Sequence, residues 1–367
     1  PEVVDAMIPY LREHFGNPSS GHVYGQRARE AVERARAQVA AALGCDPDEV
    51  VFTSGGTESS NLAIRGAVEA RPDRAHVVTT VIEHPATLAP CAWLESHGVR
   101  ISRAGVGGDG RARAGEMIDA IGGGTALVTL MHSNNETGVL QPVEEIARAA
   151  RERGVVVHTD AAQSVGKVPV DVRAMGVDLV TVAGHKLYAP KGVGALYVRR
   201  GTPLVPFARG AGHERGVRPG TENVASIVGL GVACEIARSS LDTHATVMRT
   251  LRDGLWERLR AGIPGIALNG HAELRLPNTL NVRAPSVSGN AWLDAAPEVA
   301  ASTGSACHAG EERASKVILA MGVDAGEALG SVRLTLGRRN SREDIDRAAV
   351  ALIAAWREVS ALNARRS

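Results

Sequence analysis

Asp160 and Lys186 each stand just past an apolar run that predicts a buried strand, Val155–Thr159 for the acid and Asp178–Val182 for the lysine. The carboxyl ends of parallel strands meet at one edge of an α/β sheet, and ligands bind there. A lysine amine forms a Schiff base with an aldehyde, and a carboxylate pairs with a protonated pyridine nitrogen. The two residues together predict a site for pyridoxal 5'-phosphate (PLP), in which Asp160 keeps the ring cationic so that it accepts electrons from a carbanion.

A phosphate site is predicted in the turn Ser54-Gly55-Gly56-Thr57-Glu58, which follows the expected strand Val50–Thr53 and opens a helix. Exposed backbone N–H groups and the helix dipole attract an anion at such a turn, and the Thr57 hydroxyl adds a donor. The alternative is an ordinary helix start, in which Ser54 or Thr57 caps the first turn. Beside the lysine–aspartate pair, phosphate binding through Gly56 and Thr57 is the stronger interpretation.

Three more polar side chains follow expected strands or the acid itself. His84 ends one strand, where its ring could stack on the cofactor and move protons, although a lone histidine there is more often structural. Asn135 ends another strand and could bind the cofactor oxygen or a substrate carboxylate, although paired asparagines usually form turns. Gln163, shortly after Asp160, could donate a hydrogen bond to the phenolic oxygen of the ring.

Two residues nearer the C-terminus could handle a substrate. Arg333 lies in an otherwise apolar strand, where an inward guanidinium needs an anion. A substrate carboxylate would accept two parallel hydrogen bonds from it, and a structural ion pair is the alternative. Cys307 lies in Gly304–Gly310, a run of small residues. A cysteine is usually a buried small apolar residue, but this setting favours a mobile loop with a nucleophilic thiol, whose pKa His308 could lower.

Strand and helix patterns alternate between residues 29 and 200, which predicts an α/β domain with a mostly parallel sheet. The expected strands are short, rich in valine and bounded by turn residues. They cover residues 50–53, 76–81, 126–131, 155–159, 178–182 and 193–198. A long helix, Leu241–Arg260, is expected to leave this domain. We therefore expect a large PLP-binding domain over residues 14–242, and a small α+β domain from residues 1–13 and 243–367 that carries the cysteine loop.

The composition bounds the possible functions. A chain of 367 residues can form two domains. Lysine supplies only four of its 41 basic residues, and arginine cannot lose a proton to form an imine, so lysine is expected where amine chemistry is needed. A net charge of +1 gives no case for direct nucleic-acid or membrane binding, and no apolar run is long enough to span a bilayer. Four widely spaced cysteines indicate neither zinc ligands nor disulfides, so no metal is expected and a cytoplasmic location fits.

The ordered motifs of the chain resemble those of the cysteine desulfurases, a branch of the class V aminotransferases that serves iron–sulfur assembly and thiolation pathways. The resemblance covers nearly the whole chain. The matching segments are Phe15–Ser20, Thr53–Asn61, Glu83-His84, His132–Gly138, Asp160–Gly166, Gly184–Val198, Gly212–Gly216, Arg218–Asn223, Gly304–Cys307 and Val332–Gly337. It implies the PLP-transferase fold (fold type I, like aspartate aminotransferase), with a mostly parallel seven-stranded sheet and a small α+β C-terminal domain.

The resemblance also implies roles for individual residues. Lys186, His84 and Cys307 are the catalytic residues, with Cys307 as the one that takes the sulfur. The implied cofactor contacts are Lys186, Asp160, Gln163, His84 and Asn135, with Gly56, Thr57 and His185 on the phosphate and Thr221 on the phosphate of a neighbouring subunit, which implies a homodimer. Asn17, Asn135 and Arg333 orient the substrate. Ala183 departs from the pattern, since relatives usually have serine there, and one lost hydrogen bond weakens PLP binding by about 1 kcal/mol.

The implied reaction converts L-cysteine to L-alanine, and the sulfur passes to Cys307 as a persulfide and then to an acceptor protein. Acceptors of such enzymes serve iron–sulfur assembly, tRNA thiolation or DNA phosphorothioation, and the sequence leaves this choice open. A selenocysteine lyase or another class V aminotransferase is one alternative, and a sulfur-carrier scaffold protein is an alternative of a different class. The presence of Lys186, Asp160, His84 and Cys307 favours the enzyme.

Overall fold

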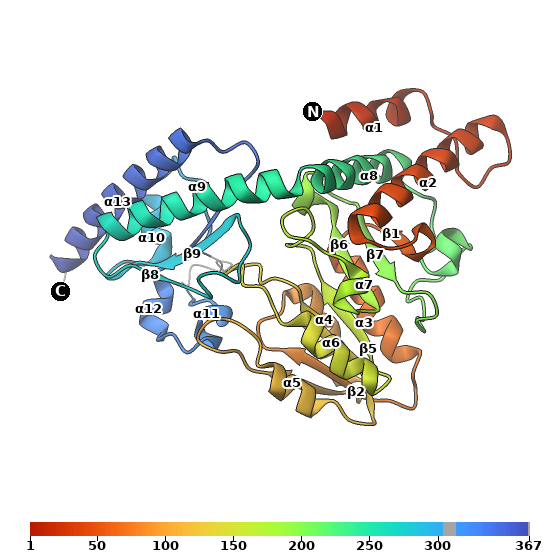
Figure 1. The fold of residues 1–367 in the computed structure, drawn as a ribbon, viewed down its shortest axis with the longest axis horizontal. Helices are drawn as coiled ribbons and strands as arrows, with labels where there is room; N and C mark the ends of the chain where they lie inside the picture. Colours follow the sequence, from red (N-terminus) through yellow and green to blue (C-terminus); the bar gives the residue numbers. More distant parts are fainter. Residues whose placement is uncertain (304–312, 366–367) are drawn as a thin grey trace. The chain divides into compact units, whose positions relative to one another are not determined.

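The chain forms two compact units in the computed structural model, which describes residues 1–303 and 313–365 (Figure 1). The first unit comprises Pro1–Ala104, Ala114–His132 and Gln141–Leu241, and the second comprises Gly105–Arg113, Ser133–Leu140 and the residues from Asp242 onward. This division differs from the expected one. Residues 1–13 belong to the first unit, because helix α1 (Glu2–Arg12) packs on α8 (Val224–Ser239), and two short segments from the middle of the chain belong to the second.

A seven-stranded sheet, counted within the described residues, forms the centre of the first unit, in the order β1-β7-β6-β5-β4-β2-β3. The strands are β1 (Val50–Thr53), β2 (His76–Thr80), β3 (Arg100–Ala104), β4 (Thr125–Met131), β5 (Val156–Asp160), β6 (Leu179–Ala183) and β7 (Gly194–Val198). Neighbouring strands from β3 to β6 pair in parallel, and β7 runs antiparallel to both β1 and β6. The predicted α/β fold with a mostly parallel sheet is confirmed.

Helices cover the central strands of this sheet. Every residue of β2, β4, β5 and β6 is buried, as expected of valine-rich strands covered on both faces. Apolar side chains of α3 (Gly56–Glu69) and α4 (Pro85–Ser96), such as Leu62 and Leu94, pack on the sheet. The other helical elements of this unit are α2 (Val23–Leu43), α5 (Ala114–Ala120), α6 (Val143–Glu152), α7 (Val172–Met175) and the 3-10 turns η1 (Pro47–Glu49), η2 (Gly184–Leu187) and η3 (His213–Gly216).

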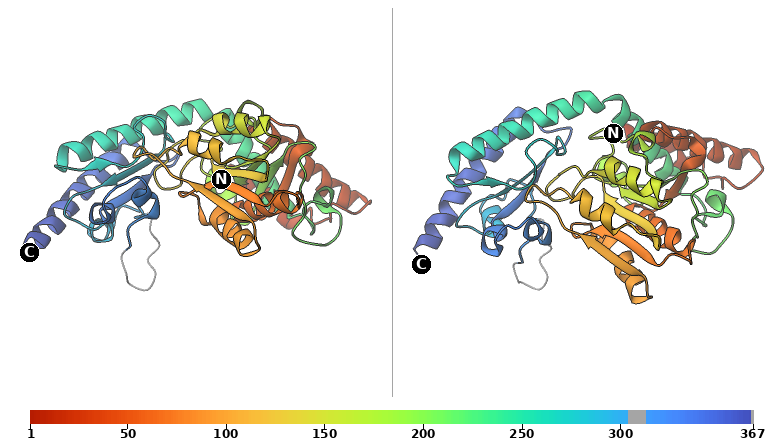
Figure 2. Two further views of the ribbon diagram at one scale, coloured as in Figure 1. Left: turned by 90° about the horizontal axis from the view of Figure 1, so that it is seen from below. Right: turned by 60° about the horizontal axis from the view of Figure 1, so that its bottom comes forward.

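The second unit contains a small antiparallel sheet in the order β10-β9-β8, on which α9 and α13 pack side by side (Figures 1 and 2). Its elements are β8 (Ala267–Leu268), β9 (Thr279–Arg283), β10 (Ser331–Thr335), α9 (Leu241–Gly262), α10 (Gly289–Asp294), α11 (Lys316–Ala320), α12 (Ala325–Leu329) and α13 (Arg342–Ala364). Trp292 of α10 is fully buried in this core, and its Nε1 donates to the Leu352 carbonyl oxygen at 2.8 Å. The unit is therefore α+β.

A buried ion pair ties α2, β1 and η3 together in the first unit. Arg36 Nη2 lies 2.8 Å from Glu214 Oε1, and the two side chains are only 5% and 2% exposed. Glu214 also accepts a hydrogen bond from the Phe52 amide at 2.7 Å, and Arg36 donates to the Val50 carbonyl oxygen at 2.8 Å. Glu214 and Arg215 adopt left-handed backbone conformations, with φ of 46° and 57°, which cost a residue other than glycine roughly 1–2 kcal/mol each. The ion pair holds this strained turn against the sheet.

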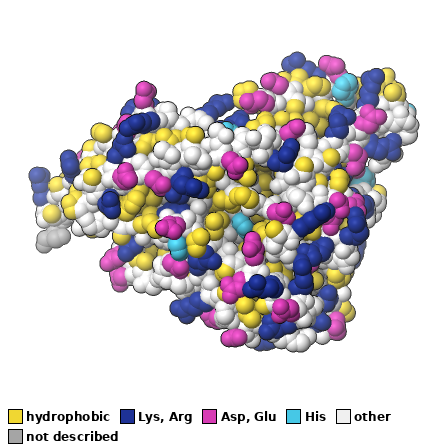
Figure 3. Space-filling view, in the orientation of Figure 1, with side chains coloured by type: hydrophobic (Ala, Val, Ile, Leu, Met, Phe, Trp, Pro, Cys, Tyr) yellow, Lys and Arg dark blue, Asp and Glu magenta, His cyan; other side chains and the backbone are white. Residues whose placement is uncertain are grey.

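Positive and negative side chains are interspersed on the face of the molecule that Figure 3 shows, in keeping with the net charge of +1. No single helix in the described part of the chain is both long and apolar enough to cross a membrane, whereas α8 and α9 pass that test jointly, across a break where the chain bends by 73°. Side chains of α8 such as Ile227 and Leu230 are buried in the first unit.

We expect Glu214→Ala to lower the free energy of unfolding by roughly 3–5 kcal/mol, because it leaves the Arg36 guanidinium buried without its carboxylate. Glu33→Ala is the matched control. Glu33 contacts the same guanidinium at 3.2 Å but is 57% exposed, so its loss should change the free energy of unfolding by less than about 1 kcal/mol. Urea unfolding followed by circular dichroism measures both variants, and equal effects would show that the buried pair does not hold the turn.

Candidate active site

The predicted lysine and acid come together at the carboxyl ends of β5 and β6. β5 ends at Asp160 and β6 ends at Ala183, and the two strands pair in parallel with Asp160 opposite Thr181. The turn η2 follows β6 directly and carries Lys186. The pKa of His84, which follows β2, is lowered by burial and by the charge of Lys186, so the histidine lies near the same lysine. Three predicted site residues from three separate strand ends therefore share one neighbourhood.

Asp160 is a buried carboxylate, with 8% of its surface exposed. Burial raises the pKa of Asp160 to about 6, although the Ala162 amide, 2.9 Å from Oδ1, and the charge of Lys186 oppose the rise. No ion pair to Asp160 forms within residues 1–303 and 313–365. A buried carboxylate favours a directly bonded cation, and the protonated nitrogen of a pyridine ring would supply one. The residues present at this strand end therefore fit PLP.

His84 begins helix α4, where its Nδ1 accepts a hydrogen bond from the Ala86 amide at 3.1 Å. Nε2 is then the nitrogen that carries hydrogen in the neutral ring. Because the pKa of His84 lies below its usual value, the ring is neutral at pH 7. A neutral ring held at one nitrogen is suited to stacking on an aromatic cofactor, and the stack itself stays a prediction.

The turn after β1 has the features of an anion site. Gly55, with φ of 148°, is the N-cap of α3, and no side chain of the described residues caps this helix. The alternative in which Ser54 or Thr57 caps it is therefore wrong. Thr57 is exposed, and its hydroxyl forms no hydrogen bond within the part of the chain that the structure describes. The first amides of this 14-residue helix and the Thr57 hydroxyl are open to a phosphate group.

Two glycines let this turn lie close to the strands beside it. A Cβ on Gly194 of β7 would stand 2.7 Å from the Gly55 Cα, which is closer than backbone atoms tolerate. A Cβ on Gly56 would meet the Cβ of Ala183 at 3.2 Å. Since Ala183 ends the strand that leads to Lys186, the close approach brings the turn after β1 to the strand end that precedes the lysine.

Glu58 and Arg218 bond to each other beside the turn after β1, and the sequence alone assigned neither of them a role. Glu58 Oε2 accepts a hydrogen bond from the Ser54 amide at 2.7 Å, and Glu58 Oε1 pairs with Arg218 Nε at 2.8 Å. Arg218 lies three residues before Thr221, the residue predicted to reach a partner's phosphate. The available signal was a glutamate at the third position of a helix, where side chains commonly bond the preceding backbone.

Glu83, directly before His84, is a buried carboxyl that links the ends of β2 and β4. Its Oε1 accepts hydrogen bonds from the Thr80 hydroxyl at 2.6 Å and from the Met131 amide at 3.1 Å. Its Oε2 is buried without a hydrogen-bond partner among the described residues. Burial raises the pKa of Glu83 to about 8, against the two hydrogen bonds, and the nearby Asp160 adds to the rise. Glu83 is therefore protonated in neutral solution, and Asp160 is the charged acid of the two.

Gln163 and His185 also lie beside Lys186. The Lys167 ammonium donates to the Gln163 carbonyl oxygen at 2.9 Å and to the Lys186 carbonyl oxygen at 3.1 Å. His185 is exposed overall, but partial burial of its ring, followed by the charge of Lys186, lowers its pKa. The predicted contacts of Gln163 with the ring and of His185 with the phosphate stay predictions.

Asn17 and Thr221 lie on exposed segments of the first unit. Asn17 Oδ1 accepts a hydrogen bond from the Ser19 amide at 2.9 Å. Within the residues described, neither side chain bonds to the group around Lys186. Both roles therefore rest on the resemblance alone, and the exposure of Thr221 in a single chain suits a residue expected to act in a partner.

Arg333 and Asn135, 198 positions apart, meet in the second unit. Arg333 Nη1 donates to the Asn135 carbonyl oxygen at 2.7 Å. Burial raises the pKa of the neighbouring Glu136, while a hydrogen bond from Ser315 and the charge of Arg333 oppose the rise. No ion pair to Arg333 is found in the described residues, so the structural ion pair considered above is not what holds it. The guanidinium keeps donors for an anion such as a carboxylate.

Cys307, the predicted sulfur acceptor, lies outside the described residues. The three cysteines that the structure describes are poor nucleophiles, because burial raises the pKa of Cys45, Cys91 and Cys234 to about 12 in each case. Cys91 and Cys234 are fully buried. A thiol must ionise to attack sulfur or carbon, so none of these three is prepared for the chemistry predicted for Cys307.

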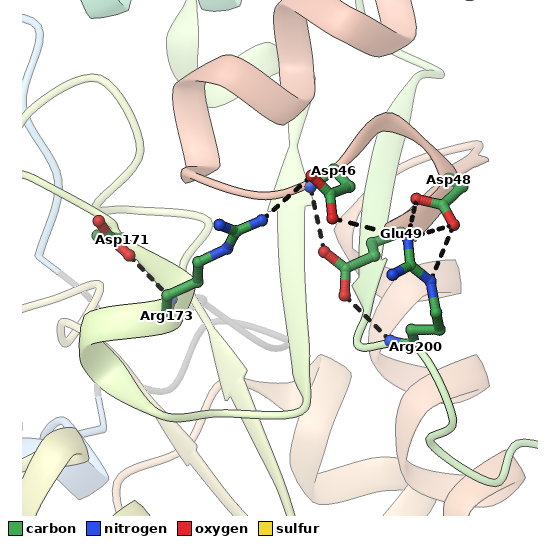
Figure 4. Close-up of polar contacts among 6 residues, drawn as sticks. All are labelled: Asp46, Asp48, Glu49, Asp171, Arg173 and Arg200. Carbon is green, nitrogen blue, oxygen red and sulfur yellow. Dashed lines mark hydrogen bonds and ion pairs between the residues drawn. The ribbon is translucent and has the colours of Figure 1, made fainter.

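Cys45 is held protonated in part by the acidic turn that follows it. Glu49 and Asp46 raise the pKa of Cys45 beyond the effect of burial. Figure 4 shows that two acids of this turn bond arginines from other elements: Arg173 Nη2 donates to Asp46 at 3.1 Å, and Arg200 Nη2 donates to Asp48 at 2.8 Å. This charged cluster joins η1 to the segments after β5 and β7, and we assign it a structural role.

Comparisons with known proteins give consistent matches. A family model described as aminotransferase class-V matches residues 1–348. A cysteine desulfurase of Trichormus azollae is 46% identical over 349 residues, which cover 95% of this chain and 87% of that protein. Among solved structures, a NifS-like protein matches with a TM-score of 0.90 at 35% identity, over 96% of this chain and 94% of that chain. DndA from Streptomyces lividans matches with a TM-score of 0.80 at 38% identity, over 91% of this chain and 95% of that chain.

The free energy of unfolding should fall as the pH rises from about 4.5 towards 8, because the folded protein keeps a proton on Glu83 that the unfolded chain has already released. Asp160, whose pKa is raised to about 6, acts in the same direction over the lower part of this window. Glu83→Gln has no proton to lose there and should flatten the dependence. Urea unfolding of the cofactor-free protein across this range measures it.

Glu95→Gln is the control for this pH series. Glu95 is an exposed carboxyl whose pKa is lowered by its hydrogen bond with Arg103. It is ionised in the folded state throughout the window and in the unfolded state over all but the lowest part, so its loss should leave the slope nearly unchanged. The same slope in the wild-type protein and in Glu83→Gln would show that Glu83 is ionised in the folded state.

Proposed function

This chain belongs to the aminotransferase class-V family, and we propose that it is a cysteine desulfurase with PLP as its cofactor. It converts L-cysteine to L-alanine, and it passes the sulfur first to a cysteine of its own and then to an acceptor protein. The relative named cysteine desulfurase, 46% identical over 95% of this chain, supports the reaction class. The observation that carries the proposal is the grouping of Lys186, Asp160 and His84 at the strand ends of the first unit.

That grouping favours an enzyme over a sulfur-carrier scaffold. A scaffold needs surfaces for its partners but has no use for a buried carboxylate beside a lysine. Burial disfavours the charged form of Asp160 in the protein alone and so raises its pKa. A bound cation would stabilise that charged form. Strongly shifted ionisable groups of this kind cluster at functional sites. The free-energy cost of burying the Asp160 carboxylate is explained if the site binds a cofactor with a protonated nitrogen.

Each contact that PLP needs has a proposed residue in this chain. Lys186 would hold it covalently, Asp160 would pair with its ring nitrogen and His84 would cover its ring. Gln163 and Asn135 are proposed to contact its oxygen, and Gly56, Thr57 and His185 its phosphate. When bound, PLP supplies an electron-accepting ring that stabilises negative charge at the substrate Cα.

Substrate binding is proposed to use Arg333 together with Asn17 and Asn135. The Arg333 guanidinium donates one N–H to the Asn135 carbonyl oxygen. Its remaining N–H groups are proposed to donate to the α-carboxylate of L-cysteine, which accepts two parallel hydrogen bonds. The Lys186 amine then takes the proton from the substrate Cα, because a neutral lysine amine can act as a general base. His84, neutral and bearing hydrogen on Nε2, can pass a proton in the same place.

Sulfur transfer is assigned to the thiolate of Cys307. The thiolate attacks the sulfur of the substrate, an S–S bond forms, and the Cβ–S bond breaks with its electron pair passing to the carbon skeleton. That skeleton takes up protons and leaves as L-alanine, and Cys307 is left as a persulfide. The raised pKa values of Cys45, Cys91 and Cys234 support this assignment, since those thiols stay protonated.

We also propose a homodimer. Phe15 and Tyr24 stack with ring centroids 6.0 Å apart, yet they are 79% and 53% exposed. Large apolar side chains gathered on a surface favour a partner. A second copy of this chain is the proposed partner, because Thr221 is expected to reach the phosphate bound to that copy.

The acceptor is proposed to be a cytoplasmic protein in iron–sulfur assembly, tRNA thiolation or DNA phosphorothioation. The near-neutral net charge supports a protein rather than a nucleic acid or a membrane as the direct partner. Transfer of labelled sulfur from L-cysteine to purified candidate acceptors separates the three pathways.

Lys186→Ala is expected to lose covalently bound PLP. Borohydride reduction followed by peptide mass spectrometry should find PLP on Lys186 in the wild-type protein and on no lysine in the variant. Lys191→Ala is the matched control, because Lys191 is an exposed lysine on the following segment, and it should keep the adduct. A reducible adduct that survives in Lys186→Ala would show that the lysine is wrongly assigned.

Cys307→Ser is expected to keep the PLP adduct on Lys186 but to release sulfide from L-cysteine at the background rate, because serine cannot accept sulfur. Sulfide release with a thiol reductant present is the measurement. Cys45→Ser serves as the control and should retain turnover, since the pKa of the Cys45 thiol keeps it protonated. Full turnover by Cys307→Ser would remove Cys307 from the reaction.

A further inference from the structure

Lys167 is one of only four lysines in the chain, and the reaction proposed above gives it no role. It lies in the turns that follow Asp160 at the end of β5. Its ammonium donates to the carbonyl oxygens of Gln163, at 2.9 Å, and of Lys186, at 3.1 Å. One side chain therefore joins the segment after β5 to the turn that carries the cofactor lysine.

The residue before Lys167 fixes the course of this segment. Gly166 has φ of 76°, and a Cβ there would stand 2.9 Å from the Cβ of Ala237 in α8. Only glycine permits both the left-handed conformation and the close approach to α8. The backbone that leads into Lys167 is thus held on one side by α8, and its ammonium is held on the other side by the Lys186 carbonyl.

The electrostatic setting of Lys167 is unusual for a structural lysine. Burial, and then the charge of Lys186, lowers the pKa of Lys167 to about 8. In the described part of the chain no carboxylate forms an ion pair with it; its two recorded acceptors are carbonyl oxygens. A buried ammonium is usually paired with a carboxylate. This one stands beside a second amine.

We infer that Lys167 is a positioning residue for Lys186, which fixes the lysine-bearing turn against the Asp160 segment and whose charge weakens proton binding at the Lys186 side-chain nitrogen. The inference rests on the proposed function, in which that nitrogen must lose its proton before it can bond the cofactor or take the substrate proton. A second cation beside a lysine is a known way to activate its amine.

The other charged groups near Lys186 leave this task to Lys167. Asp160 is an anion and favours the protonated amine. His84 and His185 have lowered pKa values and are neutral at pH 7. Glu83 is protonated there, since its pKa is about 8. Lys191, whose charge also acts on His185, is exposed and bonds to neither carbonyl oxygen. At pH 7 the Lys167 ammonium is therefore the cation held against the turn of Lys186, where it opposes the effect of Asp160.

The test is a pH titration of the holoenzyme, followed through the visible absorbance of the lysine-bound cofactor. Lys167→Met removes the charge and both hydrogen bonds, Lys167→Gln keeps a donor without the charge, and Lys167→Arg keeps both. The midpoint should rise by about one pH unit, or tenfold in proton affinity, in the Met and Gln variants and stay at the wild-type value in the Arg variant. Lys191→Met is the control, because Lys191 bonds to neither carbonyl, and it should shift the midpoint by less than about 0.3 units.

A second readout separates this inference from the proposed function. In the cofactor-free protein, reductive methylation of Lys186 at several pH values, read by peptide mass spectrometry, reports the titration of the amine itself. It should show the same rise in Lys167→Met and Lys167→Gln. Wild-type midpoints in both variants would overturn the role of Lys167. Absence of a PLP adduct on wild-type Lys186 would instead overturn the proposed function, while the amine titration would still decide the role of Lys167.

Discussion

A carboxylate buried at the end of a central strand loses most of its hydration, so the surrounding groups must stabilise its charge. Asp160 is in this position, and the elements around it are arranged in response. β6 pairs alongside and delivers Lys186, while Glu83 and His84 lie near but stay neutral at pH 7. These two neighbours add no further negative charge beside Asp160, which suits the proposed binding of a cationic ring there. The proposed cofactor site therefore depends first on this one carboxylate.

Two ion pairs hold the irregular segment between β7 and α8 against the ends of the strands. Glu214 and Arg36 anchor its strained turn, and Arg218 and Glu58 join it to the phosphate turn. The first pair is almost fully buried and the second is partly exposed. Because this segment also carries Thr221, the pairs connect the stability of the fold to the place where a second copy is proposed to contribute. A loop of this length needs such anchors, since it has little regular backbone bonding of its own.

Much of the fold and part of the site could be predicted from the sequence. The valine-rich central strands were found because a run buried on both faces has a plain apolar pattern, whereas β3 was missed because Arg100 and Arg103 are exposed at the sheet edge. The placement of Asp160, Lys186 and His84 at neighbouring strand ends could be predicted because polar side chains that bind ligands in such sheets follow strand ends, and their roles stay predictions. The placement of α1 was missed, since its packing on α8 depends on a contact more than 200 residues away.

The residues that support the site were harder to find, for a physical reason. Glu83 and Lys167 act by bonding backbone atoms of other elements, the Met131 amide in one case and the Lys186 carbonyl in the other. Every residue but proline carries those backbone groups, so no pattern of side-chain types reveals the contact. The helix cap that the sequence offered as an alternative at Ser54 or Thr57 failed because Gly55 occupies the cap position.

The three described thiols, each with a pKa of about 12, have a consequence for the life of the protein in a cell. Oxidation by peroxide and capture by electrophiles both proceed through the thiolate, and burial also excludes the reagent from Cys91 and Cys234. Polysulfides and peroxides would leave Cys45, Cys91 and Cys234 intact. Oxidative damage would then inactivate the protein at the proposed sulfur acceptor, Cys307, while the core around the other cysteines stayed folded.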